Sequence, residues 1–310
     1  MARIHDSLTD LVGSTPLLHV RRLIPEGRVL AKLESFNPAA SVKDRAALAM
    51  IRAAEADGRL APGGTILEAT SGNTGIALAW IGAAEGYRVV LVIPEDQSEE
   101  RRTLVRGLGA ELVLTPGAEG MAGANRKAGE ILAATPGAWL VGQGGNPANL
   151  EAHYTTTGPE IWADTDGGVD IFVATAGTGG TVTGAGRFLK EHNPDVRIVA
   201  VEPAEAPVLN GGPWQPHKIQ GIIGGNGIPP ITDPTLFDEV IDVPQEEALD
   251  VAREALRVEG LIAGISSGAA LAAARVLAAR PENAGKTIVA VLPDTGERYL
   301  STDLFEPFRG

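Results

Sequence analysis

The chain has 310 residues, a formal net charge of −13 and 44% hydrophobic residues, so it is long enough for one large domain or two modest ones. Its lysines and arginines are scattered rather than gathered in a basic stripe, which argues against a nucleic-acid-binding role. The absence of cysteine excludes disulfides, a cysteine nucleophile and cysteine metal ligands.

The N-terminal sequence MARIHDSLTD is polar and charged, unlike a secretory signal. The longest apolar run, residues 76–84, is far shorter than the ~20 residues that span a bilayer. We therefore expect a soluble, cytoplasmic protein that does not enter a membrane.

The first helix is predicted to begin within PAASVKDR, residues 38–45. Ser41 has the character of an N-cap, and Asp44 follows it at the spacing of a capping box. Lys43 then falls in the first turn, where a cation meets the positive end of the helix dipole. Arg45 lies in the same turn, so a misplaced cation alone does not identify a functional lysine.

Short β-branched runs alternate with longer alanine-rich runs along the rest of the chain. The predicted strands are 65–70, 88–94, 170–176, 197–203 and 287–293, and the predicted helices are 76–85, 181–192, 246–260 and 267–280. This alternation indicates βαβ units and mostly parallel sheets. The length favours two domains, and we place a boundary near the loop 142–149. Ligands of open α/β sheets bind at such loops.

Three glycine-rich loops each follow a predicted strand and open a predicted helix: TSGNTG at 70–75, GTGGT at 177–181 and GISSG at 264–268. Backbone N–H groups at such a helix start can hold an anion. GTGGT is the preferred phosphate site, and a tight turn that needs glycine for its backbone is the alternative interpretation.

Other nucleotide and hydrolase patterns fit less well. The Walker pattern is absent, and GxGxxG fails because Val182 stands where the third glycine belongs. Glu202, about 20 residues on, nevertheless keeps a nicotinamide enzyme as a distant alternative. The GISSG loop matches a nucleophile elbow, but no histidine follows Ser266 to act as its base.

The five histidines are too far apart in sequence to suggest metal ligands, so no metal site is expected. For His153 and Tyr154 we favour packing or surface hydrogen bonding over a role in a site.

A lysine at a helix N-terminus is unfavourable as an ammonium ion, but the cost disappears when its nitrogen forms an imine. The field of the helix would also lower the pKa of the amine. Lys43 together with a phosphate loop therefore suggests pyridoxal phosphate held as a Schiff base.

The motifs PAASVKDR, TSGNTG, GTGGT, GISSG and GERYLST resemble the cysteine synthase (O-acetylserine sulfhydrylase) family of fold type II pyridoxal-phosphate enzymes. The similarity runs from GSTPL at 13–17 to GERYLST at 296–302. It implies an α/β fold of the tryptophan synthase β type, with two domains that are each a mostly parallel twisted sheet flanked by helices. By analogy, residues 46–145 would form the smaller mobile domain, and residues 1–45 and 146–310 the larger one.

The resemblance also implies roles for matching residues. Lys43 would form the Schiff base and then act as the acid and base at the substrate α-carbon. The substrate carboxylate would be held by Thr70, Ser71, Gly72, Asn73, Thr74 and Gln143. Asn73 would also bind the cofactor 3′-oxygen, and Ser266 would face the pyridine nitrogen. The cofactor phosphate would be held by Gly177, Thr178, Gly179, Gly180 and Thr181.

The implied reaction is β-replacement, in which O-acetyl-L-serine loses acetate to give an aminoacrylate and sulfide adds to form L-cysteine. The neutral hydroxyl of Ser266 suits β-elimination better than transamination. A cystathionine β-synthase-like use of homocysteine is the alternative, because Gly144, Gly145 and the loop 221–230 depart from the usual family pattern. The resemblance further implies a homodimer and a possible serine acetyltransferase partner.

Overall fold

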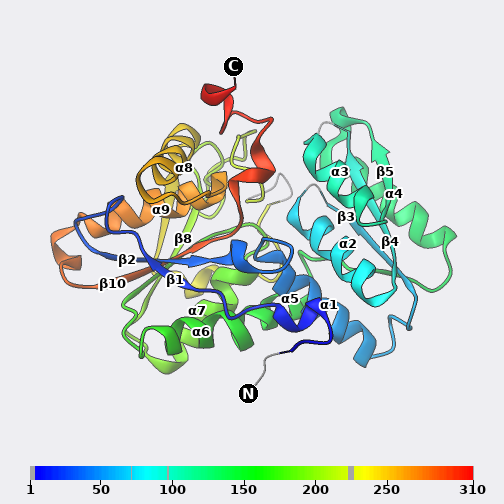
Figure 1. Cartoon of the computed structure of the whole chain (residues 1–310), viewed down its shortest axis with the longest axis horizontal. Helices are drawn as coiled ribbons and strands as arrows, with labels where there is room; N and C mark the ends of the chain where they lie inside the picture. The colour runs from blue at the N-terminus through cyan, green and yellow to red at the C-terminus, as the bar shows by residue number, and fades with distance from the viewer. Residues whose placement is uncertain (1–3, 71, 96–97, 223–226, 310) are drawn as a thin grey trace.

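The computed structural model describes residues 4–70, 72–95, 98–222 and 227–309, and these fold around two separate β-sheets (Figure 1). The smaller sheet, on the right in Figure 1, is built only from strands between residues 65 and 140. The larger sheet uses strands from both ends of the chain. The N-terminal and C-terminal parts of the chain therefore fold together, with the middle part inserted between them.

The larger sheet has six strands in the order β1-β2-β10-β7-β8-β9. Their bounds are β1 (Leu17–His19), β2 (Arg28–Leu33), β10 (Thr287–Leu292), β7 (Ile171–Thr175), β8 (Arg197–Pro203) and β9 (Glu239–Val243). All neighbours run parallel except the antiparallel pair β1–β2. The central strands are rich in valine, isoleucine and alanine because helices bury both faces of the sheet.

Helices α8 (Gln245–Glu259) and α9 (Ile265–Ala278) share one hydrophobic core with the larger sheet. Helices α6 (Gly158–Asp164) and α7 (Gly180–His192) contribute to a second core of that sheet. Figure 1 shows the two pairs on opposite sides of the sheet. The alanine-rich sequence of α9 is consistent with its place, because this helix is buried over most of its length.

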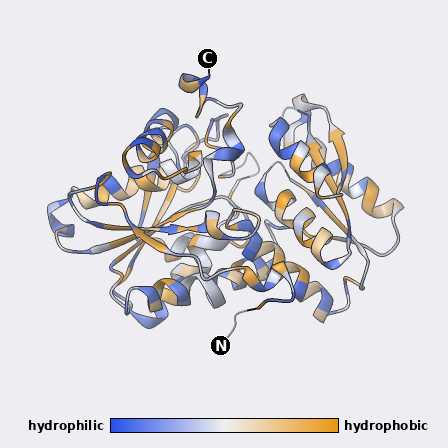
Figure 2. Ribbon diagram, viewed as in Figure 1, coloured by the Kyte–Doolittle hydropathy of each residue, from blue (hydrophilic) through white to orange (hydrophobic). Residues whose placement is uncertain are grey.

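The smaller sheet has four parallel strands in the order β5-β4-β3-β6. Their bounds are β5 (Glu111–Thr115), β4 (Arg88–Pro94), β3 (Thr65–Ala69) and β6 (Ala138–Leu140). Three helices, α1 (Lys43–Ala56), α2 (Asn73–Glu85) and α3 (Glu99–Gly107), pack in one core with this sheet, and α4 (Gly120–Ala134) packs in another. The hydrophobic residues along β3, β4 and α2 stand out in Figure 2.

A continuous helical segment connects the two halves. It comprises α5 (Pro147–Ala152), one π-helical turn (His153–Thr157) and α6. Helix α5 contacts α1 as well as α7, so it lies between elements that pack on different sheets.

Every strand and helix predicted from the alternating pattern is confirmed, with ends that shift by up to three residues. The predicted helix 76–85, for example, begins earlier, at Asn73. The capping box at the start of α1 is wrong. The Asp44 carboxylate accepts from the Ala39 N–H instead of capping its own helix, while the Ser41 hydroxyl accepts from the Lys43 N–H.

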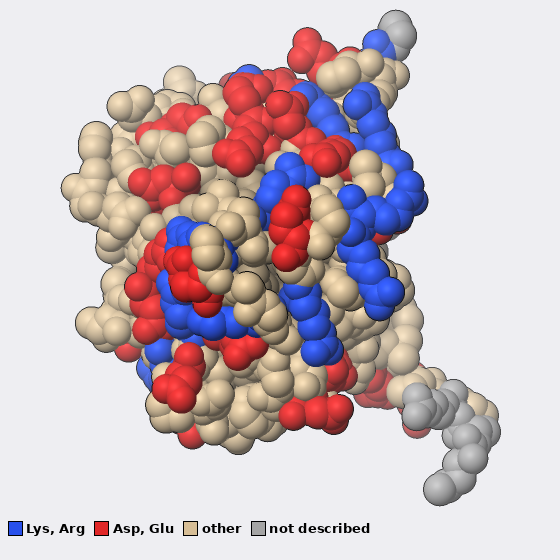
Figure 3. All heavy atoms as spheres, turned by 90° about the vertical axis from the view of Figure 1, so that its left-hand side faces the viewer, with Lys and Arg blue, Asp and Glu red and all other residues tan. Residues whose placement is uncertain are grey.

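Within the described residues, no helix combines the length and apolarity needed to cross a membrane. Acidic and basic side chains are interspersed over the face shown in Figure 3. Surface ion pairs of the described chain include Arg275 with Glu254 and Lys218 with Glu246.

Candidate active site

A cavity of about 300 Å³ lies where the two halves of the molecule meet. Its walls come from loops at the carboxyl ends of β3, β7 and β10, which is where open parallel sheets place their ligand sites. The lining residues that sequence analysis predicted are Lys43, Thr70, Gly72, Asn73, Thr74, Gln143, Gly177, Thr178, Gly179, Gly180, Thr181 and Ser266. Ser71, also predicted, lies outside the described residues.

Lys43 is the first residue of α1 and reaches the cavity with an amine that is poorly solvated. Burial lowers the pKa of Lys43 to about 8, against the opposing effect of the nearby Asp294 carboxylate. The lowered pKa of this amine was expected, but burial rather than the field of the helix is its main cause. No ion pair within the described part of the chain includes Lys43, so the amine is available to a ligand.

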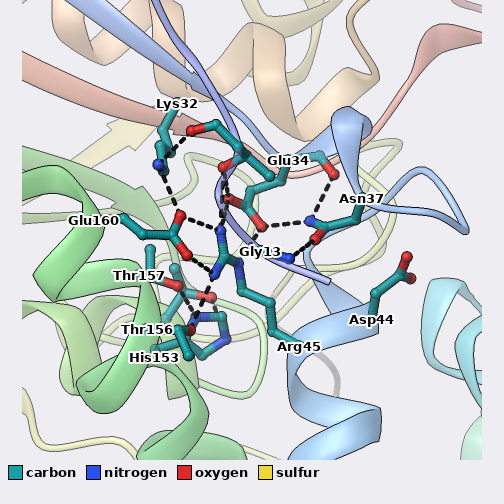
Figure 4. A network of polar contacts seen from close by, with 12 residues as sticks. Gly13, Lys32, Glu34, Asn37, Asp44, Arg45, His153, Thr156, Thr157 and Glu160 are labelled. Atoms are coloured by element: carbon teal, nitrogen blue, oxygen red, sulfur yellow. Dashed lines mark hydrogen bonds and ion pairs between the residues drawn. The ribbon is translucent and has the colours of Figure 1, made fainter. Parts of the chain in front are cut away.

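Arg45, the second cation of the same turn, has a structural explanation (Figure 4). Its guanidinium bonds both carboxylate oxygens of Glu34 at 2.7 and 2.9 Å and both of Glu160 at 2.6 and 2.7 Å. Lys32 pairs with Glu160 from the other side at 2.9 Å. These contacts fix the start of α1, and hence Lys43, to the larger half of the molecule.

The loop 177–181 lines the same cavity, where β7 leads into α7. Gly179 has φ of +79°, and a Cβ there would stand 2.0 Å from the Thr232 hydroxyl oxygen, so only glycine fits. Helix α7 begins at Gly180, and its dipole and free N–H groups favour an anion at this wall. The donor set therefore fits a phosphate, and the desolvated amine of Lys43 lines the same cavity.

The third wall is made of hydroxyl and amide groups around the N-terminus of α2. Asn73 donates through Nδ2 to Asp294 Oδ2 at 2.6 Å, and Thr74 donates to Gln143 Oε1 at 2.6 Å. Because the Gln143 amide oxygen already accepts, its NH₂ group is the end available to a carboxylate.

Glu68 holds the loop that carries Gln143. This buried carboxylate accepts from the Gly142 N–H at 2.8 Å and the Gln143 N–H at 3.3 Å. Burial raises the pKa of Glu68 to about 7, although the two N–H groups partly oppose the rise.

Sequence reasoning missed Asp294 as a lining residue. Its Oδ2 accepts from Asn73 and from the Tyr299 hydroxyl, each at 2.6 Å, and its Oδ1 is buried without a partner in the described chain. The available signal was its place directly after the predicted strand 287–293, at the edge where the other loops gather. Met121 and Gln220, also missed, lie in segments for which no element was predicted.

Two sequence interpretations change with the structure. Glu202, the residue behind the nicotinamide alternative, is buried and accepts from the Leu209 and Asn210 N–H groups, so it holds a loop rather than lining the cavity. His153 is buried and bonds Thr181 of the loop 177–181 at 3.2 Å, so it supports a wall of the cavity in addition to packing.

Comparison with known proteins connects this geometry to a chemistry. The model of the family described as pyridoxal-phosphate dependent enzyme matches residues 8–294. The chain is 51% identical to cysteine synthase A of Escherichia coli strain K12, over 98% of this chain and 97% of that protein. It is 48% identical to a cysteine synthase of Staphylococcus aureus, over 97% of each chain.

Solved structures of similar fold include a cysteine synthase as well. The crystal structure of cysteine synthase from Entamoeba histolytica superposes with a TM-score of 0.94 at 45% identity, covering 98% of this chain and 91% of that one. The structure of an O-ureido-L-serine synthase gives a TM-score of 0.95 at 44% identity, covering 99% and 97% of the two chains.

Proposed function

The chain belongs to the pyridoxal-phosphate-dependent enzymes, within the cysteine synthases, and from this premise we propose how its residues make L-cysteine from O-acetyl-L-serine and sulfide. When bound, the cofactor supplies an electron sink that allows the substrate to exchange acetate for sulfide at its β-carbon. The fold type II architecture accords with this chemistry, because the cavity lies between two helix-flanked sheets.

The observation that carries the proposal is Lys43. Its amine has a pKa lowered to about 8 and lines the same cavity as a loop suited to phosphate. Lys43 would hold the cofactor covalently and would then move the proton at the substrate α-carbon through its Nζ atom. An amine with a pKa near the working pH can both accept and return such a proton.

The remaining cofactor contacts follow from the opposite wall. Gly177, Thr178, Gly179, Gly180 and Thr181 would hold the phosphate, because the α7 N-terminus and two hydroxyl groups gather there. Ser266, in the first turn of α9, would face the pyridine nitrogen, and Asn73 would bind the 3′-oxygen. A serine hydroxyl cannot hold the ring nitrogen protonated as a carboxylate would, which suits loss of a β-leaving group.

The substrate carboxylate would be held at the α2 wall. Thr70, Gly72, Asn73 and Thr74 supply hydroxyl, amide and backbone N–H groups, and Gln143 supplies its NH₂ group. Ser71 belongs to the same motif. Asp294 accepts from the Asn73 amide nitrogen at 2.6 Å and Arg298 donates to the Asn73 amide oxygen at 3.1 Å, so both ends of this amide are held in place.

We further infer that residues 46–145 form the smaller, mobile domain and that residues 1–45 and 146–310 form the larger one. All four strands of the smaller sheet lie within the first range, and the Arg45 contacts to Glu34 and Glu160 anchor the chain just before it. Closure of this domain would bring Gln143 and the α2 wall onto the substrate and exclude water from the reaction.

A homodimer is the assembly we propose. Phe36 is 65% exposed, and close to it in sequence Pro38, Ala39 and Ala40 line a hollow of about 330 Å³. The same hollow is lined by Trp80 and Leu104 and by the charged residues Glu100, Arg101, Glu297 and Arg298. A second copy of the chain would remove this surface from water. Serine acetyltransferase is a further candidate partner, testable by co-elution, and the cytoplasm is the proposed location.

Turnover with defined substrates tests the function. Purified protein is expected to be yellow, to change its visible spectrum when O-acetyl-L-serine is added, and to recover the first spectrum with release of cysteine when sulfide follows. Consumption of homocysteine with L-serine, and none of sulfide with O-acetyl-L-serine, would overturn the assignment in favour of a cystathionine β-synthase-like reaction.

A further inference from the structure

Asn149 of α5 is an uncharged side chain outside the cavity lining that contacts two of its walls at once. It is 1% exposed, and its Nδ2 atom donates to the Gln143 carbonyl oxygen at 2.9 Å and to the Thr178 hydroxyl oxygen at 3.0 Å. An asparagine NH₂ group has two N–H donors, so each donor serves one wall.

The two acceptors belong to different halves of the molecule. Gln143 follows β6, an edge strand of the smaller sheet, whereas Thr178 follows β7 in the middle of the larger sheet. The side chain of Asn149 therefore joins the loop proposed for the substrate carboxylate to the loop proposed for the cofactor phosphate.

The orientation of the Asn149 amide follows from its contacts. The Gln143 carbonyl can only accept, so the amide nitrogen must point toward it. The Oδ1 atom of Asn149 then lies against Gly180, so close that a Cβ added to Gly180 would stand 2.3 Å from it. This Oδ1 has no hydrogen-bond partner in the described chain.

The donated bonds also set the direction of the groups that receive them. Because the Thr178 hydroxyl accepts from Asn149, its own proton is free to be donated into the cavity that Thr178 lines. Gln143 is held at its carbonyl by Asn149, at its N–H by Glu68 and at its amide oxygen by Thr74, so these three contacts restrain the position of its NH₂ group.

We propose that Asn149 is a positioning residue that couples the two walls, so that a phosphate bound at Thr178 orders Gln143 for the substrate carboxylate. This inference rests on the proposed roles of Gln143 and Thr178. The coupling is reciprocal, because two ligands that bias one shared contact affect each other's affinity equally.

His153 offers a matched comparison on the same helical segment. It bonds Thr181 of the phosphate loop at 3.2 Å and Thr157 within its own turn at 2.9 Å, and none of its described contacts reaches Gln143. It therefore supports one wall only. Asn283 provides a control for folding, since it is equally buried and donates to the Leu277 carbonyl away from the cavity.

The test is a double-mutant cycle between Asn149→Ala and Thr178→Val. Two quantities are measured: the Kd of pyridoxal phosphate for the cofactor-free protein, and kcat/KM for O-acetyl-L-serine at saturating cofactor. Asn149→Ala is expected to raise the Kd and to lower kcat/KM, each about tenfold, as loss of one buried hydrogen bond does. Asn283→Ala is expected to change neither.

The decisive result is the effect of Thr178→Val on kcat/KM. We expect a loss of about fivefold when residue 149 is asparagine and almost none when it is alanine, because the effect passes through the shared amide. His153→Ala, by contrast, is expected to raise the cofactor Kd and to act additively with Asn149→Ala. Equal losses from Thr178→Val in both backgrounds would overturn the coupling.

Other outcomes separate this inference from the proposed function. Gln143→Ala should lower kcat/KM whether or not the coupling exists. If neither Gln143→Ala nor Thr178→Val changed kcat/KM, the proposed site itself would be refuted. If Asn149→Ala fails to fold, Thr178→Ser replaces it in the test. That variant keeps the hydroxyl acceptor and should retain the kcat/KM that Thr178→Val loses, and an equal loss would contradict the proposal.

Discussion

At the scale of single residues, the cavity and the loop behind it contain groups whose charges depend on burial rather than on ion pairs. Lys43 and Glu68 illustrate this in opposite directions, because desolvation lowers the pKa of the amine and raises that of the carboxyl. Each group is therefore poised to change its protonation near neutral pH.

Glu68 gives a pH-dependent stability. Between about pH 4.5 and 7 the folded protein keeps the Glu68 proton that the unfolded chain has already lost, so this residue's stabilising contribution falls as pH rises through that window. The shift corresponds to roughly 3 kcal/mol at ~1.4 kcal/mol per pKa unit. The Glu68→Gln variant should lack this pH-dependent loss of stability. The free energy of unfolding of the variant minus that of the wild type should therefore increase between pH 4.5 and 8.

Urea unfolding at several pH values measures this difference. Glu151→Gln, a change at an exposed carboxylate, serves as the control and should show no comparable trend. A difference between Glu68→Gln and the wild type that stays constant across this pH range would show that Glu68 is ionised in the folded protein throughout.

At the scale of elements, α1 depends on a buried network at its first turn. Arg45 and Glu34 are nearly inaccessible to solvent, and removing one partner of such a pair leaves an uncompensated buried charge. Arg45→Met is therefore expected to destabilise the protein by about 3 to 5 kcal/mol.

A second arginine of the same helix provides the comparison. Arg52 forms ion pairs with Glu55 and Glu85 but is about half exposed, so Arg52→Ala should cost less than about 1 kcal/mol. Chemical denaturation of both variants checks the prediction. Similar losses in the two would mean that burial of the Arg45 network does not determine its contribution.

The elements found from sequence show what periodicity can detect. Strands such as β4, β8 and β10 were visible because continuous β-branched runs mark strands buried on both faces. The edge strands β1 and β6 have only three residues each, and α3 is dominated by charged residues, so none carried such a signal. The predicted capping box failed because the Asp44 carboxylate accepts from the Ala39 N–H, in the turn that precedes the helix.

The site was found in a similarly selective way. Glycine loops and Lys43 could be recognised because their chemistry is local in sequence. Asp294, Asn149 and Glu68 could not, because their roles arise from contacts with residues such as Asn73, Thr178 and Gln143 that only the folded chain brings together.

At the scale of the whole molecule, the proposed dimer makes the exposed Phe36 an interface residue. Phe36→Asp should shift the protein toward the monomer in light scattering after size exclusion, because a charge would be buried at the interface. Phe308→Asp changes another exposed aromatic, near the C-terminus, and should leave the mass unchanged. A wild-type protein that is monomeric at micromolar concentration would contradict the assembly.

In the proposed account, the division into two halves allows the smaller half to close over a substrate bound between them. The loop proposed for the cofactor phosphate and the Arg45 contacts belong to the larger half, while the α2 wall belongs to the smaller one. Lys43 stands at the junction, fixed by its neighbour Arg45 to the half that would hold the phosphate.

The most direct measurement is the location of the covalent cofactor bond. The loaded protein is reduced with borohydride, digested and analysed by mass spectrometry, beside Lys43→Ala and the surface variant Lys127→Ala. We expect the cofactor mass on the peptide that contains Lys43 in the wild type and in Lys127→Ala, and no attachment or cysteine formation in Lys43→Ala. Attachment at a different lysine, or an active and labelled Lys43→Ala protein, would contradict the assignment of this residue.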